Sequence, residues 1–148
     1  MTNEAMIKVI EQDLLRLKTE LESYKDEKKL WITEGAVNNS AGNLALHLIG
    51  NLKHFIGAVL GKSGYVRNRD AEFSSKNIPV TTITKEIDET LDIVKKTILS
   101  LTDEDYAKDY PEKIFSFPMT TGYFVIRLIE HLGYHLGQIS YHRRLLDK

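Results

Sequence analysis

Apolar residues recur every three or four positions over long parts of this chain. In the N-terminal part the recurring positions are Met6, Ile10, Leu14, Leu17, Leu21 and Tyr24. In the second half they are Ile87, Leu91, Val94, Ile98 and Leu101. This spacing is the period of an α-helix with one face in a core, so it predicts two amphipathic helices. The first is expected to have Thr2 or Asn3 as its N-cap, and the second to begin near Thr84.

Two further helices are predicted from apolar segments with a helical period. One covers about 41–60, with Asn39 or Ser40 as its N-cap and Gly61 as the residue just past its end. The other is the last helix of the chain, at about 122–146. No segment shows the alternation of apolar and polar residues that is typical of a β-strand.

The connection between the second and third predicted helices is long. It covers residues 62–83 and is rich in Ser, Asn, Gly and charged residues, and loops of about 20 residues are often functional. Such a connection can return the chain to the opposite end of a bundle, so these two helices could run in the same direction. Before the last helix, Thr102 can cap a short helical turn, and Pro111 and Pro118 prevent a regular helix.

Together these elements predict an all-α fold. The expected architecture is a four-helix bundle with a long crossover between helices two and three. The chain of 148 residues is long enough to bury a core without disulfides, so residues 1–148 are expected to form a single domain.

Composition narrows the classes of function. The net charge is −1, with acidic and basic residues interspersed, so no basic stripe indicates a nucleic-acid partner. The absence of cysteine excludes thiol catalysis, cysteine-ligated zinc and disulfides, and fits a reducing cytoplasm. The N-terminal segment does not resemble a signal peptide, and no stretch approaches the roughly 20 apolar residues of a membrane span. A soluble cytoplasmic protein without a membrane partner is expected.

Histidine is the residue type that carries the candidate chemistry. His131 and His135 lie one turn apart in the last predicted helix, and His142 falls between them in azimuth, since each residue turns a helix by about 100°. The same stripe contains Phe124 and Leu128, which are expected to face the core. The histidines are therefore predicted to point inward.

The second predicted helix repeats this pattern. One of its stripes contains Leu44, His47, Asn51, His54 and Ala58. If the two helices are antiparallel, His47 or His54 would reach the level of His131 and His135. Two imidazoles at i and i+4 and a third from another helix can bind one metal ion and leave positions open, which is the geometry of catalytic rather than closed structural sites.

A polar seam without metal is the alternative interpretation of these stripes. Buried imidazoles need partners, and mutual hydrogen bonds with Asn51, Gln138 and Tyr141 could supply them. The sequence pattern alone leaves both interpretations open.

Several classes of site are excluded by the residues around the histidines. Leu132 follows His131, so the glutamate of the H-E-x-x-H zinc proteases is missing. Gly133 stands three residues after Glu130, so the E-x-x-H pair of di-iron bundles is missing too. No G-x-S-x-G motif indicates a serine hydrolase. Any metal is expected to be a single ion bound mainly by nitrogen.

Glycines inside predicted helices are a smaller indication. Gly50 and Gly57 lie in the second helix, and Gly133 and Gly137 in the last. Each is less favourable than alanine in a helix interior by about 1 kcal/mol. Close approach of helices around a site would explain them, and a tight helix–helix or dimer contact would do so equally well.

Two segments carry a resemblance to a known family. The segments HLIGNLKHFI and HLGYHLGQI, together with the loop RNRDAEF, resemble the DinB-like superfamily of metalloproteins over essentially the whole chain, and a bacillus-type subfamily most of all. The final motif of this family reads H-x-x-H-H-R-G-Q, in which the first and third histidines bind metal. His131 and His135 match these two positions, whereas Tyr134 and Leu136 replace the middle histidine and the arginine.

The resemblance implies a specific set of ligands and partners. His47 matches the remaining ligand of the family, whereas His54 and His142 match none. The family implies a four-helix bundle, frequently a homodimer, that holds one divalent ion such as zinc or nickel. Some relatives are transferases or isomerases that use a low-molecular-weight thiol, bacillithiol or mycothiol.

The sequence and the resemblance together predict a metal-binding helical protein that acts on a small molecule. A metal-activated water or a thiol would perform hydrolysis or S-transfer, and Asn51 and Gln138 would contact the ligands or the substrate. The competing hypothesis is a non-catalytic protein with a structural metal or an unmetallated seam of histidines.

Overall fold

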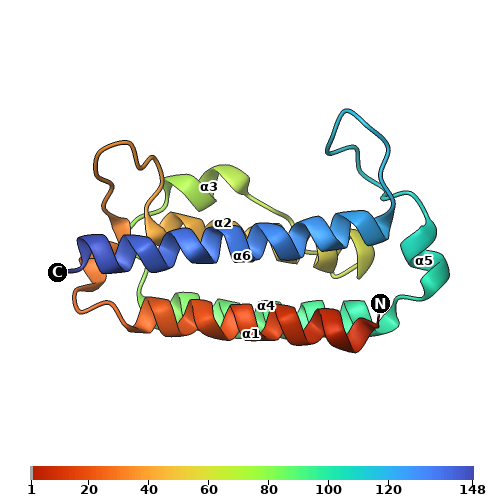
Figure 1. The fold of residues 1–148 in the computed structure, drawn as a ribbon, viewed down its shortest axis with the longest axis horizontal. Helices are drawn as coiled ribbons and strands as arrows, with labels where there is room; N and C mark the ends of the chain where they lie inside the picture. The colour runs from red at the N-terminus through yellow and green to blue at the C-terminus, as the bar shows by residue number, and fades with distance from the viewer. Residues whose placement is uncertain (1) are drawn as a thin grey trace.

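The computed structural model describes residues 2–148, and these residues form six α-helices without a β-strand (Figure 1). The helices are α1 (Asn3–Glu22), α2 (Ala41–Leu52), α3 (Arg69–Ser74), α4 (Val80–Ser100), α5 (Asp103–Ala107) and α6 (Thr121–Leu146). A 3-10 helix, η1 (Glu27–Trp31), follows α1, and a π-helix, η2 (Lys53–Leu60), continues α2 directly. The predicted all-α class is confirmed.

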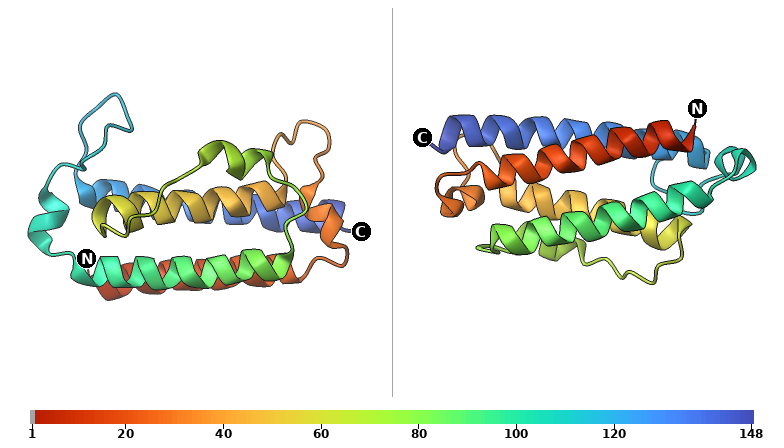
Figure 2. Two further views of the ribbon diagram at one scale, coloured as in Figure 1. Left: turned by 180° about the vertical axis from the view of Figure 1, so that it is seen from behind. Right: turned by 90° about the horizontal axis from the view of Figure 1, so that it is seen from below.

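The long helices lie in two layers. One layer holds α1 and α4, and the other holds α2 with η2 and α6 (Figures 1 and 2). Each long helix packs against two of the others, because α1 contacts α4 and α6, and α2 also contacts α4 and α6. In Figure 1, α1 and α6 run in one direction and α2 and α4 in the other. The second and third long helices are therefore parallel to each other, and α2 is antiparallel to α6.

The predicted stripes form the core between the layers. Ile10, Leu14 and Leu17 from α1 are fully buried and pack with the buried face of α4, which includes Ile87 and Ile98. The start of α4 differs from the sequence prediction, since it lies at Val80 instead of near Thr84. Val80 and Ile83 are buried, so tertiary packing extends the helix by a turn.

Side-chain caps fix where several helices begin. Thr2, Ser40, Thr102 and Thr120 each accept a hydrogen bond from the backbone N–H three residues on, at 3.2–3.3 Å. Such a cap satisfies one of the free donors at a helix start. The predicted caps at Thr2, Ser40 and Thr102 are confirmed.

The end of the second helix differs from the prediction in its geometry. Gly61 has a right-handed backbone with φ of −91°, and the left-handed residue is Lys62, with φ of 54°. Position 61 has no space for a larger residue, because a Cβ there would lie 2.3 Å from Oγ1 of Thr97.

The crossover between η2 and α4 contains a helix that the sequence did not predict. This helix, α3, packs on the outer side of α2 (Figure 2). Its N-cap is Asn68, whose side chain accepts from the N–H of Ala71 at 3.1 Å. Asn43 of α2 donates from Nδ2 to the backbone oxygens of Glu72 and Ser75 at 2.9 and 2.8 Å. These buried bonds hold α3 against α2 near the level of His47.

None of the helices in residues 2–148 combines the length and the apolar character that crossing a bilayer would require.

Candidate metal centre

Three histidines from two antiparallel helices meet between α2 and α6. One ring nitrogen from each of His47, His131 and His135 lies within 4.8 Å of the other two. The Nε2 atom of His131 is 3.2 Å from Nε2 of His47 and 3.1 Å from Nε2 of His135. His47 is buried, and the other two are partly exposed. The structure thus brings together the three residues that the sequence and the resemblance singled out.

The Nδ1 atoms of His47 and His135 face oxygen acceptors, and Nη2 of Arg67 also lies 3.3 Å from Nδ1 of His47. Nδ1–H of His47 donates to Oε1 of Glu72 at 3.0 Å, and Nδ1–H of His135 donates to Oε1 of Gln138 at 2.6 Å. A neutral imidazole carries one proton, so Nε2 of each of these two rings is a lone-pair acceptor. These acceptors both face Nε2 of His131, which can offer a proton to only one of them. One cation accepts all three lone pairs, so the donor set fits a metal ion.

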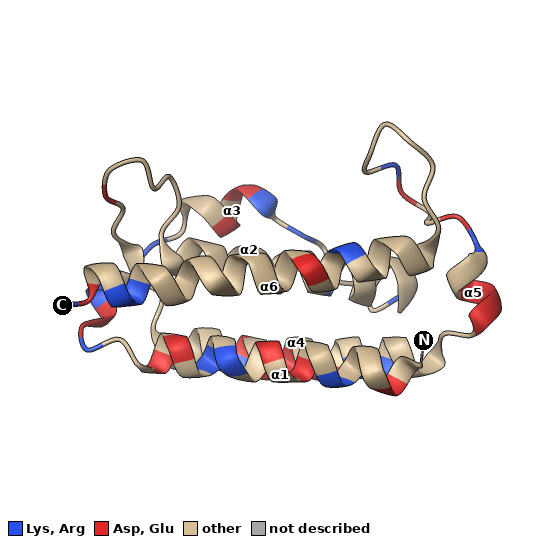
Figure 3. Ribbon diagram, in the orientation of Figure 1, with Lys and Arg blue, Asp and Glu red and all other residues tan. Residues whose placement is uncertain are grey.

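Glu72 is the residue that fixes His47, and the sequence analysis missed it. Its side chain is buried, with 6% of its surface exposed, and it forms a bidentate pair with Arg67. Nε and Nη2 of Arg67 donate to its two carboxylate oxygens at 2.8 and 2.9 Å. The α2 helix contains no charged residue, so the carboxylate beside His47 comes from α3 in the crossover (Figure 3). A carboxylate–histidine–metal arrangement has this geometry.

Space for the Glu72 carboxylate is made by a glycine of α2. A Cβ on Gly50 would lie 2.0 Å from Oε2 of Glu72 and 2.6 Å from its Cδ. The expected close approach around Gly50 is thus found, but the approaching group is a side chain and not another helix backbone. Glycine within an otherwise uncharged helix, followed by an acidic residue in a long crossover, was the available sequence signal for Glu72.

Burial favours the neutral form of His131 and His47. Desolvation lowers the pKa of His131 from 6.5 to about 4, and the neighbouring imidazoles of His135 and His47 act in the same direction. Desolvation also lowers the pKa of His47 and outweighs its hydrogen bond to Glu72, which acts in the opposite direction. Neutral imidazoles are the form that binds metal.

Two buried polar atoms near the cluster have no hydrogen-bond partner. They are Nδ1 of His131 and Oδ1 of Asn51. Asn51 lies one turn after His47 on α2, and His131 lies one turn before His135 on the antiparallel α6. A metal ion at Nε2 of His131 would leave the proton of this ring on Nδ1, which would then need an acceptor such as Oδ1 of Asn51.

The remaining two histidines lie outside the cluster. Nε2 of His54 is 3.1 Å from Oε2 of Glu112, and the ring packs against Phe55. His142 is buried, donates from Nε2 to the backbone oxygen of Ile32 at 2.9 Å, and accepts at Nδ1 from the hydroxyl of Tyr24 at 2.6 Å. Both therefore have structural partners, as the resemblance implied.

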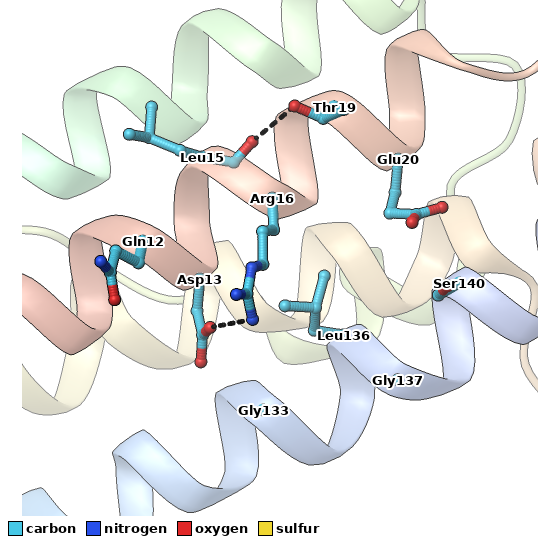
Figure 4. A pocket seen from close by; sticks show the side chains of 10 residues that line it. All are labelled: Gln12, Asp13, Leu15, Arg16, Thr19, Glu20, Gly133, Leu136, Gly137 and Ser140. Carbon is cyan, nitrogen blue, oxygen red and sulfur yellow. Dashed lines mark hydrogen bonds and ion pairs between the residues drawn. The ribbon is translucent and has the colours of Figure 1, made fainter.

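The glycines of α6 do not face the cluster. Gly133 and Gly137 line a surface groove between α1 and α6, together with Asp13 and Arg16, and no histidine lines it (Figure 4). A Cβ on Gly137 would meet no atom within 4 Å. Close helix packing within the chain therefore does not explain these two residues.

The chain belongs to a family that is described as being of unknown function. The family model described as a protein of unknown function (DUF1572) matches residues 4–148, which is nearly the full chain. A comparison with the curated proteins gives no match.

Proposed function

We propose that the protein binds one divalent cation, zinc or nickel, through Nε2 of His47, His131 and His135, and that it is a DinB-like member of the metal-dependent helical proteins. The observation that carries this proposal is the convergence of three Nε2 atoms, two of them held as lone-pair acceptors by Glu72 and Gln138. A hydrogen-bonded seam leaves at least one of the three lone pairs unmatched, whereas a cation uses all of them.

Each imidazole then has its own orienting partner. Glu72 accepts from Nδ1–H of His47, and Gln138 accepts from Nδ1–H of His135. For His131 we assign this role to Asn51, whose Oδ1 is a buried acceptor without a hydrogen-bond partner. Such partners fix the tautomer and the direction of the ring, and their loss typically weakens metal binding 10–100-fold.

A catalytic site is favoured over a structural staple by the exposure of the cluster. Structural zinc sites are closed by four protein ligands, and catalytic sites keep a position open. This cluster offers three ligands, and two of them are partly exposed. When bound, the ion supplies Lewis acidity toward a water or a thiol at its open position.

The proposed reaction is hydrolysis of a small molecule or transfer of a thiol sulfur to it. The chain contains no cysteine, so a thiol would have to be a free co-substrate of the bacillithiol type. The residues of the chain would bind and orient the reactants, with Gln138 at the exposed edge of the site beside His135.

Metal analysis of protein purified without a histidine tag tests the binding site. We expect about one equivalent of zinc or nickel, and loss of this metal in His47→Ala, His131→Ala and His135→Ala. The matched control is His54→Ala, which removes a histidine of the same helical segment and should retain the metal. Absence of stoichiometric metal, with no thermal shift on adding zinc or nickel, would contradict the proposal. Loss of metal in His54→Ala but not in His47→Ala would contradict the ligand set.

The type of reaction is tested by a screen of the metal-loaded protein. Electrophiles are offered with and without bacillithiol, and disappearance of the thiol is followed beside hydrolysis. Thiol consumption indicates S-transfer, and turnover without thiol indicates hydrolysis. If neither occurs while the metal remains bound, the non-catalytic alternative replaces the proposed reaction.

The homodimer implied by the resemblance stays a prediction. Light scattering of the protein eluting from a sizing column measures the mass of the particle. A mass twice that of the 17.0 kDa chain would agree with it.

A further inference from the structure

A cavity of about 740 Å³ adjoins the histidine cluster at His135. It lies between the segment 34–39, which follows η1, and the C-terminal part of α6. His135 and Gln138 line one part of it, and Leu145 and Lys148 line another. Positions 135 and 145 are separated by about 15 Å along the helix axis, at 1.5 Å per residue, so the cavity is elongated and begins at the proposed metal centre.

The walls of this cavity are mainly apolar. Val37 and Leu145 contribute side chains that are 48% and 62% exposed, and Leu44 contributes from the start of α2. The aromatic rings of Tyr134 and Tyr141 also line it. Apolar surface that stays open to solvent beside convergent polar groups is typical of a small-molecule site, and the volume lies within the usual range of about 300–1,000 Å³.

Two charged residues line the cavity. They are Glu34, near the end of η1, and Lys148, the last residue of the chain. The lining residues nearest to His135 along α6 are Tyr134, Gln138 and Tyr141, and none of them carries a charge. Apart from the group that binds the metal, the part of a ligand that lies along these residues is therefore expected to be uncharged, because burying a charge without a partner is unfavourable.

Hydrogen bonds that do not involve the cluster join the chain before the segment 34–39 to the C-terminal part of α6. Nε2 of His142 donates to the backbone oxygen of Ile32 at 2.9 Å, and the hydroxyl of Tyr24 donates to Nδ1 of His142 at 2.6 Å. The carboxylate of Asp147 accepts from the backbone N–H of Lys25 at 2.6 Å. These bonds lower the ordering that binding of a ligand beside His142 requires.

From these features we infer that the cavity binds the body of the small molecule on which the site acts. The ligand class is an elongated molecule with an uncharged apolar body, aliphatic or aromatic. Its head group donates an electron pair to the metal ion that His135 helps to bind. The inference rests on the proposed metal centre, since that centre binds the head group. It adds to the proposed function the class of small molecule that the site binds.

Hydroxamates of different tails test this inference on cobalt-substituted protein. Acetohydroxamate carries the metal-binding head alone, and octanohydroxamate adds an apolar chain. Titrations followed by the visible absorption of cobalt measure the two affinities. We expect octanohydroxamate to bind at least roughly tenfold more tightly than acetohydroxamate, because the chain buries several methylene groups.

A matched pair of variants tests where the alkyl chain of octanohydroxamate binds. Leu145→Asp places a charge on the cavity wall, and Leu99→Asp makes the same change on α4 at nearly the same exposure, 62% against 63%. Leu145→Asp should bring the affinity for octanohydroxamate close to that for acetohydroxamate, and Leu99→Asp should leave both affinities as in the wild type. Circular dichroism verifies that both variants are folded.

The outcomes separate this inference from the proposed function. A cobalt spectrum that is intact, with equal affinity for the short and long hydroxamates, would overturn the apolar subsite and leave the metal centre standing. An equal effect of the two leucine substitutions would overturn the location of the subsite. If no cobalt binds at all, the metal centre and the inference that depends on it are both wrong.

Discussion

The contact between Gly50 and Glu72 makes a prediction about a single methyl group. In Gly50→Ala the new Cβ would lie 2.0 Å from Oε2 of Glu72, far inside van der Waals contact. The carboxylate cannot turn away freely, since its two oxygens are held by Arg67 and by Nδ1 of His47. The substitution should therefore push Glu72 off His47 and break these buried bonds.

The expected magnitude follows from two opposing effects. Replacing glycine by alanine inside a helix stabilises it by about 1 kcal/mol. Leaving a buried donor or a buried charge without its partner destabilises the fold by about 1–3 kcal/mol for each group, and both His47 and Arg67 lose theirs. We expect a net decrease in the free energy of unfolding of roughly 1–5 kcal/mol, and a 10–100-fold decrease in metal affinity because His47 loses its orienting carboxylate.

Gly137→Ala is the matched control for this change. It also lies inside a long helix, but its Cβ would meet nothing within 4 Å, so it should stabilise the protein by about 0.5–1 kcal/mol. Urea unfolding of the metal-free proteins measures the first effect, and competition with a zinc chelator measures the second. Equal stabilisation by both substitutions, with unchanged metal affinity, would refute the claim that Glu72 is clamped against α2.

Other perturbations of the site have their own expected outcomes. Glu72→Gln keeps an acceptor for His47 but removes the charge that pairs with Arg67, so zinc affinity should fall less than in Glu72→Ala, as chelator competition would show. Desolvation lowers the pKa of His131 from 6.5 to about 4, so the metal-free fold should lose stability as pH falls through this window, because only the unfolded chain takes up the proton. The free energy of unfolding should fall by at most about 2 kcal/mol between pH 7 and 5. Urea unfolding should show a smaller fall in His131→Gln than in the wild type, and equal falls in the two proteins would contradict a neutral His131. His142→Ala should lower the free energy of unfolding by about 1–3 kcal/mol with the cobalt spectrum unchanged, and an altered spectrum would contradict its purely structural role.

The main helices and the inward histidines were predictable because they depend on local periodicity. Ile10 and Leu14 are spaced for one helix face, and both are fully buried. His131 and His135 are separated by one helical turn, so any helix through them places them together. These inferences need only the geometry of one helix at a time.

The choice between His47 and His54 depended on the register of two helices. Both residues share a stripe, and seven residues advance a helix by about 10 Å, so one ion beside His131 and His135 can reach only one of them. Periodicity predicts the direction in which a side chain points around the helix axis. It does not predict which residue of a neighbouring helix lies beside that side chain. The resemblance supplied the level, and the structure brings His47 to the cluster and leaves His54 beside Glu112.

Glu72 was beyond the reach of local patterns for a different reason. It lies 25 positions after His47, in a crossover that the sequence predicted only as a long polar loop. The short helix that presents it depends on tertiary bonds, such as those from Asn43 to the backbone of α3. Its role follows from the path of the chain over α2 and not from the composition of the segment.

That path is itself required by the topology. Since α2 and α4 run in the same direction (Figure 1), the chain must return along the bundle between them, and it does so over the outer face of α2. The same return carries Arg67 and Glu72 to His47. A cation that binds Nε2 of His47 polarises the ring and strengthens the bond from Nδ1–H to Glu72, so metal binding should stabilise the docked crossover.

Hydrogen exchange can measure this link between metal and crossover. Addition of zinc should slow amide exchange in residues 69–74, which lie in the crossover and supply no metal ligand, more than in α5, which is a short helix of similar length remote from the cluster. In Glu72→Ala the exchange of residues 69–74 should no longer respond to zinc, because the bond that transmits the effect is missing. Slowing of the same size in this variant would mean that the crossover senses the metal through some contact other than the one between Glu72 and His47.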